Sequence, residues 1–336
     1  MSGQQIAVVG SGYMGGGIAQ VFAMANASVT IADVSPEVAR ANYDRLVAET
    51  REFVDAGLFP ADAVELVRAN LRAAESIEQA VADAQFIEEA VPERLDIKHA
   101  ALARISAAAA PDAIIGSNTS TILIGSLAEA VERPERFLGV HFSNPAPFIP
   151  GVELIPHSGT DPAILPVVED LVAAAGKETA RVKDATGFVL NRLQYALFHE
   201  ATQLVEEGVA SADDIDTIVR TTFGFRLPFF GPFAIADMAG LDVYSFCYTS
   251  LQTKWPERFA TPASLSALVE AGRFGTKTGA GYLEIGAERT ADLIAYRNRA
   301  YAQMQRLLYE LGPAPIADPG DEQQRFATPA TEGAGQ

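Results

Sequence analysis

The feature that most constrains the fold is a glycine-rich segment near the N-terminus, with the sequence Gly10-Ser11-Gly12-Tyr13-Met14-Gly15. An apolar run at 6–9 precedes it, a helical pattern follows at 17–26, and a β-branched run covers 28–32. A strand, a helix and a strand within about 30 residues predict a βαβ unit, and hence a parallel sheet. The first glycine permits a tight turn, the second lets the backbone approach a phosphate, and the third lets helix and strand pack closely.

Alternating patterns continue through the first half of the chain. Helical segments separate further apolar runs at 86–91, 113–116, 137–140 and 152–156. This alternation predicts an α/β fold over 1–184, with a Rossmann-type doubly wound parallel sheet.

Two helical regions accompany this sheet. A long helical pattern over 36–74, broken at Gly57-Leu58-Phe59-Pro60, predicts a helical hairpin inserted after the second strand. Helical patterns predominate over 185–312, so we expect an all-α second domain. The tail at 313–336 is rich in Pro, Ala, Gly and acids, and we expect it to be disordered.

Asp33 ends the second strand, where nucleotide-binding βαβ units place a carboxylate for the adenosine ribose. This carboxylate would repel a 2′-phosphate, and the following Val34 offers no cation to hold one. The sequence therefore favours NAD over NADP. Because FAD and S-adenosylmethionine proteins share the glycine loop, the loop alone leaves those cofactors open.

A histidine follows the strand at 137–140. His141 would face the ligand crevice from the carboxyl end of that strand, and Glu153 lies on the next one. A histidine suits proton removal from an alcohol, and a carboxylate behind it would fix its tautomer. From these two residues alone, a histidine of an ordinary loop is the more frequent case.

Several motifs, in their order and spacing, closely resemble the L-3-hydroxyacyl-CoA dehydrogenase superfamily. They are the glycine loop, Glu89-Ala90-Val91-Pro92-Glu93, Asn118-Thr119-Ser120, His141-x-x-Asn144-Pro145, Gly187-Phe188-Val189-Leu190-Asn191-Arg192 and Lys277-Thr278-Gly279-x-Gly281-Tyr282. The resemblance covers most of the chain outside the tail. It implies an NAD-linked interconversion of a secondary alcohol and a ketone.

The resemblance also implies residue roles. His141 is the implied general base with Glu153 as its partner, and Ser120, Asn191 and Asn144 are implied substrate contacts. The implied cofactor contacts are Gly10, Ser11, Gly12, Tyr13, Met14, Gly15, Asp33, Glu93, Lys98, Ser120 and Asn144. Simpler interpretations stay open for three of them: Ser120 as a helix cap, Asn191 as a helix-start residue, and Lys98 on a solvated face.

The sequence departs from the pattern of CoA-using members in two regions, the segment after His141 and the inserted hairpin. In the first region, Ser143 replaces the second Phe of the usual His-Phe-Phe-Asn-Pro, and the segment 147–153 resembles relatives that oxidise small free hydroxy compounds. These relatives are gulonate dehydrogenase with lambda-crystallin, carnitine dehydrogenase and a pyridine-carboxylate dehydrogenase. Glu49 and Ala56 stand where CoA-using members place a serine and a lysine. We therefore expect a small 3-hydroxy acid or related hydroxy compound as the substrate, with a 3-hydroxyacyl-CoA such as 3-hydroxybutyryl-CoA as the alternative.

A non-catalytic, crystallin-like NAD-binding protein is an alternative of another class, and a flavoprotein is a weaker one.

Charge and composition restrict the partners and the location. The net charge of −18 argues against nucleic acid and anionic membranes, because both attract basic proteins. Cys247 is the only cysteine, so no intrachain disulfide and no cysteine-based metal site can form. We expect no metal, no signal peptide, no membrane span and a cytoplasmic location. The resemblance further implies a homodimer through the helical domain, and the apolar stretch 224–235 is compatible with a buried contact.

Overall fold

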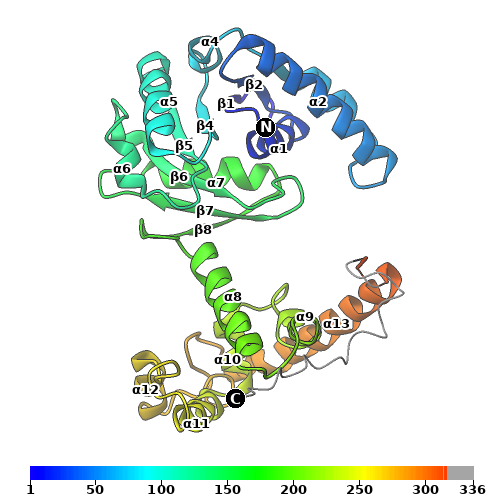
Figure 1. Cartoon of the computed structure of the whole chain (residues 1–336), viewed down its shortest axis with the longest axis vertical. Helices are drawn as coiled ribbons and strands as arrows, with labels where there is room; N and C mark the ends of the chain where they lie inside the picture. Colours follow the sequence, from blue (N-terminus) through cyan, green and yellow to red (C-terminus); the bar gives the residue numbers. More distant parts are fainter. Residues whose placement is uncertain (313, 316–336) are drawn as a thin grey trace, which may run out of the picture. The chain divides into compact units, whose positions relative to one another are not determined.

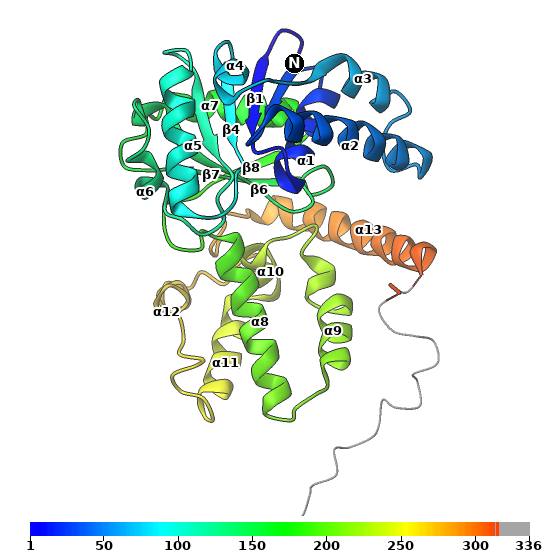
Figure 2. The same ribbon diagram turned by 45° about the horizontal axis from the view of Figure 1, so that its top comes forward.

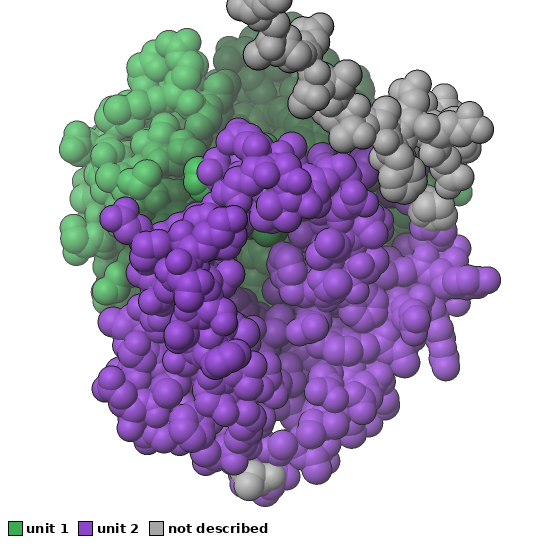
Figure 3. Space-filling model, turned by 60° about the horizontal axis from the view of Figure 1, so that its bottom comes forward, with its two compact units in different colours: residues 1–199 green, residues 200–336 purple. Residues whose placement is uncertain are grey.

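The computed structural model describes residues 1–312 and 314–315, which form two compact units (Figure 3). The first unit is Met1–His199, and the second begins at Glu200. This division falls inside a long helix, α8 (Leu190–Glu206), whereas the sequence predicts a domain boundary after 184. Apart from 314–315, the tail that we expect to be disordered lies outside the described residues.

Strands and helices alternate along the first unit, as the sequence predicts (Figure 1). In chain order they are β1 (Gln5–Val9), α1 (Tyr13–Met24), β2 (Ser28–Ala32), α2 (Pro36–Asp55), α3 (Ala63–Asn70), β3 (Leu71–Ala73), α4 (Ile77–Val81), β4 (Phe86–Glu89), α5 (Leu95–Ala108), β5 (Ile114–Ser117), α6 (Ile124–Ala128), η1 (Pro134–Arg136), β6 (Phe137–Phe142), β7 (Gly151–Pro156), α7 (Ile164–Ala174) and β8 (Glu178–Arg181).

Within the described residues the strands form one sheet in the order β3-β2-β1-β4-β5-β6-β7-β8. The predicted α/β doubly wound architecture is confirmed, and the sheet is mostly parallel with one antiparallel pair. The strands from β3 to β6 are parallel to one another, whereas β7 runs antiparallel to β6 and β8 runs parallel to β7. The loop from Phe142 to Gly151 is too short for a crossover, which normally needs a dozen or more residues.

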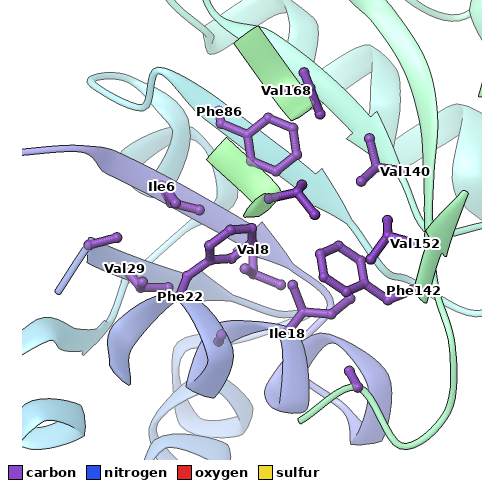
Figure 4. Close-up of a cluster of buried hydrophobic side chains, with 14 of the residues drawn as sticks. Ile6, Val8, Ile18, Phe22, Val29, Phe86, Val140, Phe142, Val152 and Val168 are labelled. Atoms are coloured by element: carbon purple, nitrogen blue, oxygen red, sulfur yellow. The ribbon is translucent and has the colours of Figure 1, made fainter. Parts of the chain in front are cut away.

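The sheet has an apolar core on each face. The helices α1 and α7 pack against one face. Phe22 of α1 lies edge-to-face with Phe86 and Phe142 of the strands, at centroid distances of 6.1 and 6.0 Å (Figure 4). Against the other face pack α4, α5 and α6, through residues such as Leu102 and Leu127. Since both faces are covered, the central strands read as continuous apolar runs in the sequence.

The predicted hairpin is present as α2 and α3, which run side by side (Figure 2). Ser35 caps α2 by accepting a hydrogen bond from Val38 N at 3.3 Å. Gly57 has φ +69°, a conformation that favours glycine and directs the chain out of α2. The short strand β3, which the sequence patterns do not predict, follows the hairpin within the range 36–74.

The described residues of the second unit, with the end of α8, form helices, as the sequence predicts. After α8 come α9 (Ala212–Thr221), η2 (Gly224–Arg226), α10 (Pro232–Ala239), α11 (Leu241–Gln252), α12 (Ala263–Glu270) and α13 (Ala287–Leu311). Two isolated bridges, Gly275 with Ala280 and Ala280 with Glu284, shape the loop before α13. None of the helices described is both long and apolar enough to cross a membrane.

Glu88 on β4 is an exception to the apolar core. Its side chain is fully buried, and neither carboxylate oxygen has a hydrogen-bond partner among the described residues. Gly116 pairs with it on β5, and a Cβ at that glycine would overlap the Glu88 carboxylate. Burial raises the pKa of Glu88 well above its ordinary value of 4.5, the charge of Glu89 raises it further, and Lys98 offsets part of the rise.

We predict that Glu88→Gln makes the stability of the protein less sensitive to alkaline pH. A carboxyl whose pKa is raised in the folded state stabilises the fold below pH 4.5, and this contribution is lost as pH rises through the folded-state pKa. Between pH 4.5 and the folded-state pKa, the free energy of unfolding of the wild type should fall by up to about 1.4 kcal/mol per pH unit relative to that of the variant. Urea denaturation at several pH values above 4.5 measures the difference. The exposed Glu129→Gln serves as the control, and equal slopes for wild type and Glu88→Gln would contradict the prediction.

Candidate active site

His141 and Glu153 face each other across neighbouring strands. They are paired residues in the antiparallel ladder of β6 and β7, and His141 Nδ1 lies 2.8 Å from Glu153 Oε2. The exposed fractions of the two side chains are 6% and 12%. The sequence patterns place His141 beyond the end of its strand. In the structure it lies within β6. The ladder itself brings the two side chains together.

The second oxygen of Glu153 accepts hydrogen bonds from the start of α8. Val189 N and Leu190 N each lie 2.9 Å from Glu153 Oε1. The preceding Phe188 has φ +47°, which is strained for a residue with a side chain, and this turn aims both N–H groups at the carboxylate. Burial by itself would raise the pKa of Glu153, but the hydrogen bonds from His141, Leu190 and Val189, with the charge of His141, hold that pKa below its usual value.

The other ring nitrogen of His141 faces Ser120. Ser120 Oγ lies 3.2 Å from His141 Nε2. Asn191, in the first turn of α8, donates from Nδ2 to the Ser120 carbonyl oxygen at 2.8 Å. The structure thus brings together all four predicted catalytic residues, Ser120, His141, Glu153 and Asn191, within the first unit.

Glu93 holds the turn that contains Ser120. Its Oε1 accepts hydrogen bonds from Ser120 N and Thr121 N at 2.8 Å each, and from Thr119 Oγ1 at 2.7 Å. Burial would raise the pKa of Glu93, but Thr119, the charge of Lys98 and the backbone N–H groups of Thr121 and Ser120 together lower it. Glu93 therefore remains an anion that organises this turn.

A cavity of about 800 Å³ lies beside the glycine loop. Its lining comes from the glycine loop, the ends of β2, β4 and β5, and α5, and includes Gly10, Gly12, Met14, Asp33, Glu93, Asn118 and Ser120. A Cβ on Gly10 would overlap the backbone of Ala90, and one on Gly15 would overlap the Gly10 carbonyl. A Cβ on Gly12 would meet nothing within 4 Å, so this glycine leaves open space beside the start of α1. These properties fit a dinucleotide whose phosphates lie at a helix N-terminus.

Asp33 lies at the wall of this cavity and also stabilises the loop. Its Oδ2 accepts hydrogen bonds from Ser11 N and Ser11 Oγ, each at 2.7 Å, and its Oδ1 accepts one from Val34 N at 2.8 Å. Arg45 of α2 donates to the Ser11 and Gly12 carbonyl oxygens at 3.2 and 3.3 Å. The loop is thus held from β2 and from the hairpin.

Five predicted cofactor contacts do not line this cavity, namely Ser11, Tyr13, Gly15, Lys98 and Asn144. Lys98 is buried, with Nζ 2.8 Å from Glu89 Oε1 and 3.2 Å from the Val91 carbonyl oxygen, and it does not line the cavity. Tyr13 is 65% exposed and is also absent from the cavity lining. Asn144 is exposed, and among the described residues its side chain forms no hydrogen bond. The buried Lys98 excludes the interpretation of a solvated face.

Asn118 is a cavity-lining residue to which the sequence motifs gave no role of its own. Its Oδ1 accepts a hydrogen bond from Phe142 N at 2.8 Å, which links the end of β5 to the strand that contains His141. Its place in the motif Asn118-Thr119-Ser120 was a signal, but a sequence does not reveal which strand its amide reaches. No group of three or more His, Cys, Asp or Glu in the described part of the chain could hold a metal ion.

Two family models match the chain. The model of the NAD binding domain of 3-hydroxyacyl-CoA dehydrogenase matches residues 5–185, and the model of the C-terminal domain of the same enzyme matches 187–285. The junction between the two matches lies beside the boundary predicted from the sequence.

Individual relatives are similar along nearly their whole length. A 5-formyl-3-hydroxy-2-methylpyridine 4-carboxylate 5-dehydrogenase from Mesorhizobium japonicum is 35% identical, over 91% of this chain and 98% of that protein. A solved structure of such an enzyme, described as an NAD⁺-dependent dismutase, is similar with a TM-score of 0.64 and 32% identity, over 92% of this chain and 99% of that one. The structure of a 3-hydroxyacyl-CoA dehydrogenase from Archaeoglobus fulgidus is similar with a TM-score of 0.75 and 29% identity, over 92% and 99% of the two chains.

Proposed function

Because the chain belongs to the 3-hydroxyacyl-CoA dehydrogenase family, we propose that it oxidises the secondary alcohol of a small free hydroxy acid to the ketone. The chain is an NAD-dependent oxidoreductase that acts on a CH–OH group. The single observation that supports the chemistry is the sequence of contacts from Ser120 through His141 to Glu153.

His141 acts as the general base in this proposal. With the Nδ1 proton donated to Glu153, Nε2 is free to accept the proton of the substrate hydroxyl. The cavity beside Gly10, Gly12 and Asp33 would hold NAD, which would supply the acceptor for the hydride of the carbinol carbon. Ser120 lies beside the same nitrogen, where its hydroxyl orients the substrate oxygen, and Asn191 fixes the Ser120 backbone from α8.

Glu153 stabilises the imidazolium that forms as His141 takes up the proton. It can do so because its pKa is held below the usual value by two backbone N–H groups and by His141 itself, although burial acts in the opposite direction. The carboxylate remains ionised while it holds the imidazole in one tautomer. In the reverse direction the same imidazolium returns the proton to the alcohol.

The hairpin supports a free acid over a CoA thioester. Glu49 forms an ion pair with Arg45 at 2.6 Å, and Arg45 is in turn bound to the glycine loop. Ala56, at the end of α2, has no polar group to offer. A CoA nucleotide therefore meets a carboxylate and a methyl group where a serine and a lysine would donate, and each missing charge-assisted bond is worth about 1.5–3 kcal/mol. Among the relatives, the pyridine carboxylate dehydrogenase acts on a free acid.

A CoA thioester remains the second candidate because of one cavity. A space of about 600 Å³ lies along α2 and α3, and its lining includes Tyr43 with the exposed Arg51 and Arg68. Two arginines and an aromatic ring could receive a nucleotide phosphate and base. The same cavity also contains Asp44, Glu52 and Asp55, so its net charge disfavours a polyanion.

A non-catalytic, crystallin-like role is disfavoured by the contacts of the four catalytic residues. A protein that only binds the cofactor does not need a buried His–Glu pair beside Ser120, because such a pair costs desolvation energy. Turnover of cofactor with any hydroxy acid would decide against that role.

We also propose that the protein is cytoplasmic. We further propose that it forms a homodimer in which the helical units of the two copies pack against each other. The buried apolar cluster of α10–α12 is small, with Ala236, Leu241 and Leu265 at its centre, whereas Phe246 is 71% exposed and Phe233 is 55% exposed. The stretch 224–235 packs partly on α13, through Phe230 and Tyr301, whose ring centroids are 6.3 Å apart. Exposed apolar side chains of this kind mark a contact surface, and contact with a second copy of the same chain is the simplest way to bury them.

We predict that His141→Gln lowers kcat by roughly 10²–10⁴-fold, the usual contribution of a general base. NADH affinity should stay nearly unchanged, because His141 does not line the cofactor cavity. Steady-state kinetics and NADH fluorescence titration measure the two effects. His99→Gln is the matched control, since His99 bonds to the Ser126 carbonyl oxygen outside the site. Near wild-type turnover in His141→Gln would refute the assignment.

The substrate class is tested by kcat/KM for 3-hydroxybutyryl-CoA against gulonate, carnitine and 3-hydroxybutyrate, at low and high salt. We predict that a free acid is preferred. Glu49→Ser with Ala56→Lys should then raise the efficiency on the thioester about tenfold, equivalent to about 1.4 kcal/mol. NADH affinity is measured alongside, because Glu49 orients Arg45 toward the glycine loop.

Glu65→Ser, on the exposed part of α3, is the control for the change of charge. A wild-type preference for the thioester of tenfold or more, which weakens as salt rises, would mean that cations bind the nucleotide and that the substrate is not a free acid.

Sedimentation equilibrium of the full chain should give twice the chain mass of 35.7 kDa. Phe246→Glu should shift the equilibrium toward the monomer by placing a charge on the apolar surface, whereas Leu58→Glu, at an exposed apolar position of the first unit, should not. A wild-type mass of 35.7 kDa at micromolar concentration would exclude the dimer.

A further inference from the structure

The loop between β6 and β7 connects the two halves of the His141–Glu153 pair. It runs from Ser143 to Pro150 and contains Asn144, which the family resemblance places beside nicotinamide and substrate. The Asn144 side chain is exposed and forms no hydrogen bond with any described residue. Its position therefore depends on how the loop backbone is held.

Lys177, at the turn between α7 and β8, holds this loop. Its Nζ donates to the carbonyl oxygens of Ala146, Pro147 and Ile149 at 2.5, 3.2 and 2.9 Å. An ammonium group has three protons, so these three bonds use its whole capacity. The residue is 7% exposed, and among the described residues no carboxylate forms an ion pair with it.

A buried cation without a carboxylate is unusual, because burial disfavours the charge. Burial indeed lowers the pKa of the Lys177 ammonium. The three carbonyl oxygens that accept hydrogen bonds from Lys177 Nζ all belong to one loop, so the loop and the lysine stabilise each other. A neutral side chain at 177 would remove this donor from one buried carbonyl oxygen, that of Ala146, and from two part-buried ones, those of Pro147 and Ile149.

Two other contacts hold the same loop from different elements. Phe148 packs against Phe53 and Phe59 of the hairpin, at centroid distances of 5.3 and 5.6 Å. On α1, a Cβ at Gly17 would lie 3.0 Å from Pro147 Cδ, so the glycine allows the loop to approach closely. Lys177 is the charged member of these contacts and the one that binds the backbone directly.

We propose that Lys177 is a positioning residue for catalysis, which fixes the 143–150 loop so that Asn144 meets the reacting groups. This proposal rests on the proposed function, because it assigns Asn144 to the substrate side of the dehydrogenase site. Lys177 touches neither the cofactor cavity nor the catalytic residues. It acts through the loop backbone.

The test is a double-mutant cycle of Lys177→Met and Asn144→Ala on the full chain. Lys177→Met keeps most of the aliphatic stem and removes the donors. We expect it to lower kcat at least tenfold when Asn144 is present, and less than twofold in the Asn144→Ala background, because both changes then disable the same contact. NADH affinity should change less than twofold. A loss that only reflected weaker folding would be the same in both backgrounds.

Lys183→Met is the matched control, since Lys183 is exposed a few residues along the chain and should have wild-type kcat. If Lys177→Met does not fold, Lys177→Gln, which retains two donors, is used in the same cycle. Additive effects of the two substitutions, or a kcat within twofold of the wild type in the lysine variant, would overturn the proposal.

A second readout separates this proposal from the proposed function. Hydrogen exchange of the Phe148 and Ile149 amides, which both donate to the Pro145 carbonyl oxygen, should be at least tenfold faster in the lysine variant. If the wild type turns over no hydroxy acid, the proposed function fails, and unchanged exchange would still overturn the role of Lys177 in holding the loop.

Discussion

The antiparallel ladder of β6 and β7 places His141 opposite Glu153, and much of the site depends on this pairing. A parallel β7 would need a long crossover connection and would remove the carboxylate from the histidine. Because the loop between β6 and β7 is short, the two strands are antiparallel, and their register places His141 opposite Glu153. The first turn of α8 then completes the arrangement, because Val189 N and Leu190 N bind the same carboxylate. One ladder thus orients the base, and Asn191 of the same helix binds Ser120.

Buried and partly exposed charges are stabilised locally around this ladder. The buried Lys98 is neutralised by Glu89, and the partly exposed Glu93 accepts hydrogen bonds from the backbone N–H groups of one turn. Lys177 binds three loop carbonyls instead of a carboxylate. Each of these groups costs desolvation energy that its partners offset, and each fixes a loop at the carboxyl ends of the strands. Glu88 differs, because its carboxylate oxygens have no hydrogen-bond partner among the described residues, and its raised pKa keeps it protonated over a wider pH range.

Much of this arrangement could be predicted from the sequence, because the signals are local. The glycine loop, the break at Gly57 and the run of helices after 185 are each encoded within a few neighbouring residues. The antiparallel direction of β7 was not predicted, although the short distance from Phe142 to Gly151 was the available signal. The strand β8 was missed because it is a polar, exposed edge of four residues. The contacts of Lys177 could not be predicted, since they join segments about 30 residues apart and no local pattern marks a buried lysine.

The central claim is that Glu153 holds the neutral His141 with its proton on Nδ1, which leaves Nε2 free to accept a proton. Nitrogen-15 NMR of histidine-labelled protein measures this directly, because protonated and unprotonated ring nitrogens have separate shifts. The chain has four histidines, and the His141→Gln spectrum assigns the signal. Our account predicts a protonated Nδ1 and an unprotonated Nε2 in the neutral ring, and loss of that tautomer in Glu153→Gln. A proton on Nε2 of the neutral ring in the wild type would contradict the account, since that nitrogen could then not act as the base.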